Sequence, residues 1–273
     1  TIPANATTAT TTFTPTNDAF YDAASNETVT LTIEGVSGGG GSARESGEQS
    51  VTLTITDDEV DPVVTLSTAS SVAENGSSLT LTATLNNATY ADVTVALASA
   101  GADSTISSGT DYSVSSSILI TAGETSATGI FTPIDDASDP VYEEAENVVV
   151  SVSNVNGGLA TENGIQTETI TITENEAVPT LSLLGAASID EKTQTATVTA
   201  NLSIKTDKTV TVSFSNSGTS TANTDYTLSN ITIGAGATSG SQTLSPVLDT
   251  DFEGGSETVK LTGSASGISG ISN

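Results

Sequence analysis

The sequence contains no cysteine, methionine, tryptophan or histidine. Without cysteine the chain forms no disulfide bond and no thiolate metal site, and without histidine it lacks the usual general base of a nucleophilic triad. Only 5 Lys and Arg residues stand against 33 Asp and Glu residues, so the formal net charge is −28. A field of this sign repels DNA, RNA and anionic lipid headgroups. We therefore expect no nucleic-acid partner and no direct membrane insertion.

Long apolar runs are lacking as well. No stretch of about 18 apolar residues occurs, so we expect neither a signal peptide nor a membrane span within these 273 residues. Apolar residues nevertheless make up 35% of the chain, and they are ordered along it. This order argues against a disordered acidic polymer.

The apolar residues alternate with hydroxyl residues. Residues 79–85 read LTLTATL, and residues 93–97, 118–120, 148–152 and 169–173 behave similarly. A period of two with Gly, Asn, Asp and Ser between the segments predicts short half-buried strands, and we find no amphipathic helical pattern. The expected fold is all-β, with tandem immunoglobulin-like β-sandwiches of about seven strands each in an elongated array.

Internal repeats divide the chain. Residues 52–59 (TLTITDDE) return as 169–176 (TITITENE), and residues 109–113 (GTDYS) return as 223–227 (NTDYT). The repeats predict one complete module at 61–177. Residues 1–60 then form the C-terminal half of a first module, and residues 178–273 form a third module without its last strand. We expect Tyr112 and Tyr226 to be packing residues at strand edges.

A carboxylate-rich segment occurs in three related copies. Residues 131–136 (FTPIDD) precede 141–146 (VYEEAE), and related segments begin at Phe13 and Leu244. Carboxylates gathered in this way repel one another, so the clusters favour sites for multivalent cations. Calcium accepts six to eight oxygen ligands, whereas magnesium keeps more water. The opposite interpretation, that these acids only solvate loops, is disfavoured because the runs repeat in register.

The complete module resembles the Calx-beta domain. The resemblance rests on an early Glu at Glu74, the Gly-Thr-Asp-Tyr element at 109–112, the Ile-Asp-Asp turn at 134–136 with Tyr-Glu-x-x-Glu at 142–146, and the acidic end at 174–176. It covers essentially the whole chain. It implies a Ca²⁺ site at one end of each sandwich, built from loops that are distant in sequence.

The resemblance also implies candidate ligands, position by position. In the complete module they are Glu74, Asp111, Asp135, Asp136, Glu143, Glu146, Glu174 and Glu176, with the Val141 carbonyl and the inserted Asp139 as supplements. In the third module they are Glu191, Asp225, Asp249, Asp251, Glu253 and Glu257. In the first they are Asp18, Asp22, Glu27, Asp57, Asp58 and Glu59. Leu248 and Asn175 stand where carboxylates are expected, and the third site is expected to be incomplete.

Two other motifs do not indicate a functional site. Residues 249–254 imitate the start of an EF-hand loop, but position twelve would be Lys260 and helices are lacking. Residues 35–39 fit the nucleophile-elbow pattern G-x-S-x-G without any histidine in the chain. A carboxylate pair of the glycosidase kind is a poor general acid when calcium keeps it ionised. We therefore expect no enzymatic activity.

The expected function is a calcium-rigidified stalk of a large bacterial cell-surface or secreted adhesin or filament, serving adhesion, biofilm formation or gliding. The composition is typical of extracellular repeat proteins. Its partners would be neighbouring modules of the same chain, with surface glycans or other proteins bound through domains outside this stretch. Alternatives are a carbohydrate- or protein-binding module, an accessory region of a secreted hydrolase, and an intracellular calcium sensor.

Overall fold

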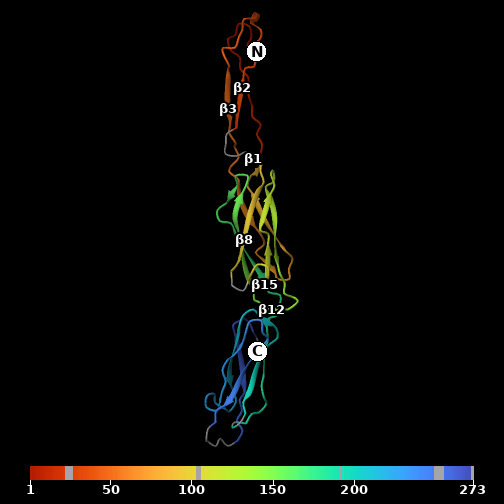
Figure 1. Cartoon of the computed structure of the whole chain (residues 1–273), viewed down its shortest axis with the longest axis vertical. Helices are drawn as coiled ribbons and strands as arrows, with labels where there is room; N and C mark the ends of the chain where they lie inside the picture. The colour runs from red at the N-terminus through yellow and green to blue at the C-terminus, as the bar shows by residue number, and fades with distance from the viewer. Residues whose placement is uncertain (22–26, 103–105, 191, 193, 249–254, 272–273) are drawn as a thin grey trace.

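The computed structural model describes residues 1–21, 27–102, 106–190, 192, 194–248 and 255–271. We call residues 1–60 the N-terminal segment, 61–177 the middle module and 178–273 the C-terminal module. Figure 1 shows the three parts following one another along the longest axis, with a hairpin at the N-terminal end and two sandwiches below it. The structure is almost entirely β, as the alternating pattern predicts.

The middle module is a sandwich of two five-stranded sheets. The strand orders are β10-β8-β13-β15-β5 and β14-β4-β6-β11-β9. The strands of the two sheets are β4 (Val63–Ser67), β5 (Ser71–Ala73), β6 (Leu79–Leu85), β8 (Val93–Gly101), β9 (Tyr112–Val114), β10 (Ser117–Ile120), β11 (Ser126–Pro133), β13 (Glu146–Asn156), β14 (Thr161–Glu162) and β15 (Thr167–Thr173). Two short strands of the module, β7 (Ala88–Thr89) and β12 (Val141–Tyr142), lie outside these sheets.

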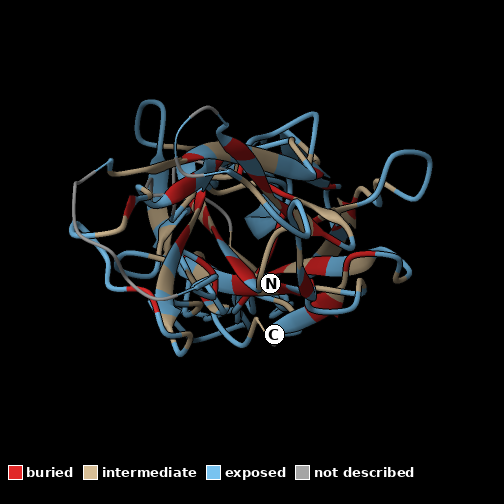
Figure 2. Cartoon of the chain, turned by 90° about the horizontal axis from the view of Figure 1, so that it is seen from below, coloured by how far each residue is buried: buried red, intermediate tan, exposed pale blue. Residues whose placement is uncertain are grey.

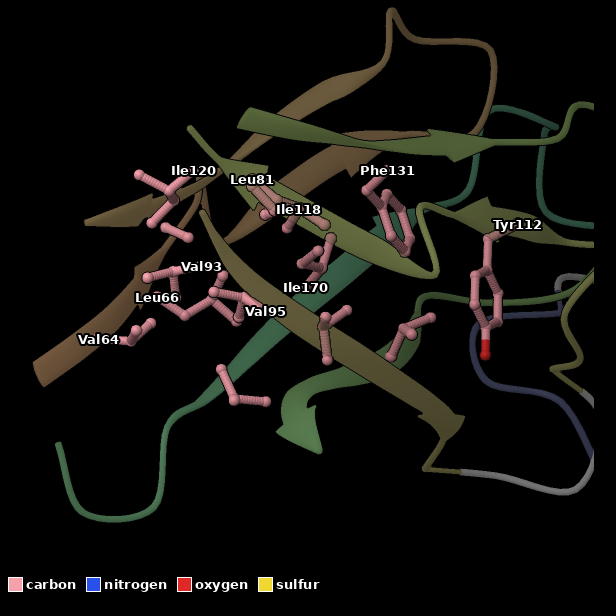
Figure 3. Close-up of a cluster of buried hydrophobic side chains, with 14 of the residues drawn as sticks. Val64, Leu66, Leu81, Val93, Val95, Tyr112, Ile118, Ile120, Phe131 and Ile170 are labelled. Carbon is pink, nitrogen blue, oxygen red and sulfur yellow. The ribbon is translucent and has the colours of Figure 1, made fainter. Parts of the chain in front are cut away.

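The core of this module comes from one face of each sheet. Along β6, Leu81, Ala83 and Leu85 are buried, while the threonines between them are exposed or half-buried. Branched aliphatic side chains from both sheets meet between the layers (Figure 3). Phe131 and Tyr112 stack at one end of this core with ring centroids 5.4 Å apart. Tyr112 is 1% exposed, so the expected packing role of this residue is confirmed.

The C-terminal module repeats most of this plan with fewer strands. Its sheets have the orders β16-β17-β22-β20 and β21-β19-β23. The strands are β16 (Leu181–Leu184), β17 (Ala196–Leu202), β18 (Lys205–Thr206), β19 (Val210–Asn216), β20 (Tyr226–Thr227), β21 (Ile231–Ile233), β22 (Ser239–Pro246) and β23 (Leu261–Ser266). Tyr226 is 4% exposed and packs in a separate core, as predicted. In the middle module, β13 lies between β8 and β15. In the C-terminal module, β23 pairs with β19 on one side, and no strand among the described residues pairs with its other side.

The N-terminal segment consists of an antiparallel hairpin and one short strand. These are β1 (Phe20–Tyr21), β2 (Glu27–Thr32), the 3₁₀ turn η1 (Gly39–Gly41) and β3 (Ser50–Ile55). Most hairpin residues are exposed. In the view along the long axis, the buried residues lie on strands and the outer loops are mostly exposed (Figure 2).

Two parallel strand pairs join the three parts. β1 pairs with β7, and β12 pairs with β18, each over two residues. We call the contact at the β1–β7 pair the first joint and the contact at the β12–β18 pair the second joint. Tyr142 of β12 is 8% exposed and belongs to the core of the C-terminal module. The middle module therefore inserts an aromatic side chain into its neighbour. No helix among the described residues is long and apolar enough to span a membrane.

Candidate metal centre

Acidic residues gather at the end of the middle module that faces the C-terminal module. Glu74 follows β5, Asp135 and Asp136 follow β11, Glu143 follows β12, and the last acids follow β15. The labels of β12 and β15 lie together at this end in Figure 1. We call this group the pole cluster, which consists of Glu74, Asp135, Asp136, Glu143, Glu174 and Glu176. Loops from both sheets thus meet at one pole.

Glu74 joins two triads of possible ligand atoms. Its carboxylate oxygen lies within 4.8 Å of oxygens of Asp135 and Asp136, and these lie within 4.8 Å of each other. Glu74 forms a second triad of the same kind with Glu174 and Glu176. The spacing suits oxygens that share a cation, and at an effective dielectric near 20 each such pair of charges repels by about 3 kcal/mol.

Backbone hydrogen bonds hold two of these carboxylates. The Val141 N–H donates to Asp136 Oδ2 at 2.6 Å, and the Glu143 N–H donates to Glu174 Oε2. Glu174 Oε1 also accepts the N–H of Glu176 at 2.9 Å. The loop that carries β12 is therefore fixed to the cluster through its backbone.

Burial and mutual repulsion act on the protonation of the cluster. Burial raises the pKa of Glu74 to about 8, and the charges of Glu174 and Asp136 add to the shift. Burial likewise raises the pKa of Glu143 to about 8, and Glu146 is the largest charge that adds to it. These carboxyls retain protons near neutral pH unless a cation compensates them.

The pKa values of two further members of the pole cluster are also raised. The pKa of Glu176 rises to about 7 because its carboxyl shares a hydrogen bond with Glu174, and burial adds to this. Burial raises the pKa of Asp136, against the hydrogen bond from Val141, which lowers it.

The donor set fits a hard cation. Glu74 is only 6% exposed. Asp136 Oδ1 is buried and has no hydrogen-bond partner in the described part of the chain. The Asn175 amide, turned to satisfy both of its ends, donates to Glu74 Oε2 at 3.0 Å. A calcium ion of high coordination number takes carboxylate oxygens of this kind as ligands.

Glu143 belongs to neither triad, and four other predicted ligands of this module lie beside the cluster. Asp111 accepts hydrogen bonds from the Ser107 N–H and, at 3.2 Å, from the Thr110 hydroxyl, which closes a local turn. Glu146 is buried at the start of β13, and the charges of both acids act on Glu143.

The other two predicted ligands belong to the joint. Asp139 forms an ion pair with Lys205 of the C-terminal module. Val141 pairs with Lys205 in the β12–β18 ladder. Both residues lie where the two modules meet, next to the pole cluster.

The N-terminal segment has a smaller acidic group. Oxygens of Asp57, Asp58 and Glu59 lie within 4.8 Å of one another, and Asp18 and Glu27 line the same cavity of about 130 Å³. A hydrogen bond shared with Asp57 is the largest cause that raises the pKa of Glu59 to about 6.

In the C-terminal module only part of the predicted site is described. Asp225 and Glu257 line one cavity of about 260 Å³. The Asp225 carboxylate accepts the Thr221 N–H, which repeats the Asp111 turn. The remaining candidates lie outside the described residues: Asp22, Glu191, Asp249, Asp251 and Glu253.

Three charged residues at the second joint, Glu144, Asp207 and Lys208, were not predicted from the sequence. Lys208 Nζ lies 3.0 Å from Glu144 Oε2 and 4.0 Å from Asp207 Oδ2. Glu144 also accepts the Ser269 N–H at 2.9 Å. Two of the chain's five basic residues fall within 205–208, and this concentration was the available signal.

No protein-family model matches the sequence, and a search of curated proteins gives no match. Similar solved structures include the apo form of the Calx CBD1 domain, at 19% identity over 42% of this chain and 99% of that chain, with a TM-score of 0.34. The adhesin InvE of Yersinia pseudotuberculosis matches at 17% identity over 76% of this chain and 56% of that chain, with a TM-score of 0.36. A putative carbohydrate binding protein from Bacteroides ovatus matches at 12% identity over 76% of this chain and 64% of that chain, with a TM-score of 0.29. Similarity at this level assigns no function.

Proposed function

We propose that this chain is a calcium-binding extender segment of a large bacterial cell-surface or secreted adhesin or filament. The observation that supports the proposal most is the position of the pole cluster, whose oxygen ligands lie beside the strand pair that joins two modules. The work is mechanical rather than catalytic. The segment spaces a distal binding domain from the cell, in adhesion, biofilm formation or gliding.

The physical basis is repulsion at the joint. In the metal-free protein, Glu74 and its acidic neighbours disfavour one another and take up protons. A bound calcium ion would supply the positive charge that lets Glu74, Asp135, Asp136, Glu174 and Glu176 stay ionised in this arrangement. Ordering of these loops then orders β12, which lies between Asp136 and Glu143. Site affinities of about 10⁻⁴–10⁻³ M suit an extracellular module.

Calorimetric titration with Ca²⁺ and small-angle scattering test the proposal on the same chain. We expect heat of binding, a higher melting temperature with Ca²⁺, and a longer maximum dimension in Ca²⁺ than in chelator. Mg²⁺ at equal concentration serves as the control and should give a smaller effect, because it keeps its water ligands. Absence of both heat and stabilisation overturns the calcium site. Binding with an unchanged maximum dimension overturns the stalk mechanism alone.

One observation favours a second candidate, a carbohydrate- or protein-binding module. A groove of about 570 Å³ lies at the first joint, lined in part by Tyr21, Tyr90 and Leu159. Tyr90 and Leu159 are 57% and 55% exposed, and tyrosine presents an apolar ring with a polar tip to such ligands. Glycan-array binding that is lost in Tyr90→Ala would favour this candidate over the stalk.

A further inference from the structure

The two joints between modules are built alike. In both, a two-residue parallel strand pair ends at a buried threonine, Thr89 or Thr206. The Thr89 hydroxyl donates to the Ala91 carbonyl at 2.6 Å, and the Thr206 hydroxyl donates to the Lys208 carbonyl at 2.8 Å. The loop after the strand therefore has the same local bonding at both joints, and its residues can be matched one to one.

The residue after each threonine differs in chemistry. It is Tyr90 at the first joint and Asp207 at the second. The Tyr90 hydroxyl donates to Asp18 Oδ2 at 2.9 Å, across the first joint. Asp18 corresponds to Asp136 in the repeated carboxylate segment. This position therefore faces the acids of the preceding module.

At the second joint the same position carries a carboxylate inside the interface. The Asp207 side chain is 7% exposed, and both of its oxygens are buried. Its N–H donates to the Tyr142 carbonyl at 3.3 Å, one residue before Glu143. The Asp207 charge also acts on Glu143.

Two carboxylates cannot repeat the tyrosine hydrogen bond. At the first joint a hydroxyl donates to Asp18, whereas at the second Asp207 and Asp136 are both acceptors when ionised. Lys208 lies closer to Glu144 than to Asp207. Asp136 Oδ1 is buried and has no partner among the described residues. A divalent cation between the two loops would attract both carboxylates, whereas the ionised pair cannot form the hydrogen bond of the first joint.

We propose that Asp207 of the C-terminal module is a ligand of the cation held by the pole cluster of the middle module, so that one metal site spans two modules. This inference rests on the proposed calcium site and extends it. At the first joint, Tyr90 occupies the position equivalent to Asp207, so a hydrogen bond to Asp18 takes the place of the shared cation. Occupancy of the second joint by calcium then directly bridges the two modules.

The test uses the full chain with Ca²⁺ and, as a luminescent probe, Tb³⁺. We compare Asp207→Asn with Asp139→Asn, which removes the same charge at the same joint from a residue that pairs with Lys205. Asp207→Asn should weaken Ca²⁺ binding at this site by about tenfold or more. Luminescence lifetimes in H₂O and D₂O should show about one additional water on the bound Tb³⁺. Asp139→Asn should change the affinity by less than about twofold.

A second variant, Asp207→Tyr, tests whether a loss of Ca²⁺ affinity arises from misfolding rather than from the lost carboxylate. It introduces the residue that the equivalent joint position already accommodates at Tyr90. We expect it to fold with the β spectrum of the wild type and to lose Ca²⁺ affinity like Asp207→Asn. Spin-label distances across the second joint should respond less to Ca²⁺ in both variants, while distances across the first joint stay unchanged.

The outcomes separate two failures. If the wild-type chain binds no Ca²⁺, both the proposed function and this inference are wrong. If the wild type binds and Asp207→Asn keeps both its affinity and its water count, the cluster stands and the role of Asp207 is wrong. Equal losses in Asp139→Asn and Asp207→Asn would show a general charge effect and also overturn ligation by Asp207.

Discussion

Raising the pH of the metal-free protein should destabilise the middle module. The pKa of Glu74 rises from the usual 4.5 to about 8 because the side chain is buried among other acids. Glu143 shows the same shift. The folded module keeps these protons above pH 4.5, whereas the unfolded chain releases them. The stabilising contribution is therefore complete below about pH 4.5 and is lost as the pH rises through about 8.

The size of the effect follows from the number of protons retained. Each proton that only the folded state holds lowers the free energy of unfolding by about 1.4 kcal/mol per pH unit. Glu74 is 6% exposed and should count in full, whereas Glu143 is more exposed and partly screened. We expect a slope between about 1.4 and 3 kcal/mol per pH unit around pH 6 to 7.

The assay is denaturant titration at several pH values. Because the sequence has no tryptophan, a Leu79→Trp reporter, placed where the side chain packs against the core, follows the middle module alone. Saturating Ca²⁺ should flatten the slope, and binding at pH 6 should release protons in calorimetry, because the cation replaces them. A free energy of unfolding that is constant or rises over pH 5 to 8 without metal would refute the reasoning.

Three further substitutions have expected outcomes. Glu74→Gln should stabilise the metal-free middle module at pH 8 and weaken Ca²⁺ binding by about tenfold or more. The control, Glu124→Gln on an exposed turn, should change neither property. Denaturant titration measures the stability, and calorimetric titration measures the Ca²⁺ affinity. Tyr142→Ala removes the side chain inserted in the neighbouring core and should broaden spin-label distances across the second joint in Ca²⁺, while distances across the first joint act as the internal control. Phe131→Ala should lower the free energy of unfolding by about 3–5 kcal/mol, because this ring is fully buried, and Ile130→Ala on the exposed face of the same strand should cost less than about 1 kcal/mol; denaturant titration compares the two.

The sandwich could be predicted because alternation is strong in its longer strands. The predicted segment 79–85 coincides with β6, and 169–173 lies inside β15. The estimate of about seven strands was low for the middle module, whose two sheets hold ten. The additional strands include β5, β9 and β14, each of two or three residues. Such short segments contain too few residues to display a period of two.

The candidate site could be predicted less completely from the sequence than the fold. Repetition in register singled out Asp136, the Calx-beta resemblance singled out Glu74, and the fold brings both together at one pole. Asp139 lies between them and β12 in sequence, yet pairs with Lys205 instead. That pairing depends on the parallel contact of β12 with β18, and local patterns carry no information about contacts between modules. Asp207 was missed for the same reason.

If the pole cluster binds calcium as proposed, metal binding and joint formation cannot be independent, because three consecutive residues contact both the cluster and the joint. The Tyr142 side chain enters the C-terminal core, and its carbonyl accepts the Asp207 N–H. The Glu143 N–H donates to Glu174 of the cluster, and Glu144, at a φ of 63°, pairs with Lys208. A shift of this short segment by one residue would withdraw the aromatic anchor, the cluster contact and the ion pair together. Any ligand that favours one position of Glu143 must therefore favour the docked joint by the same free energy.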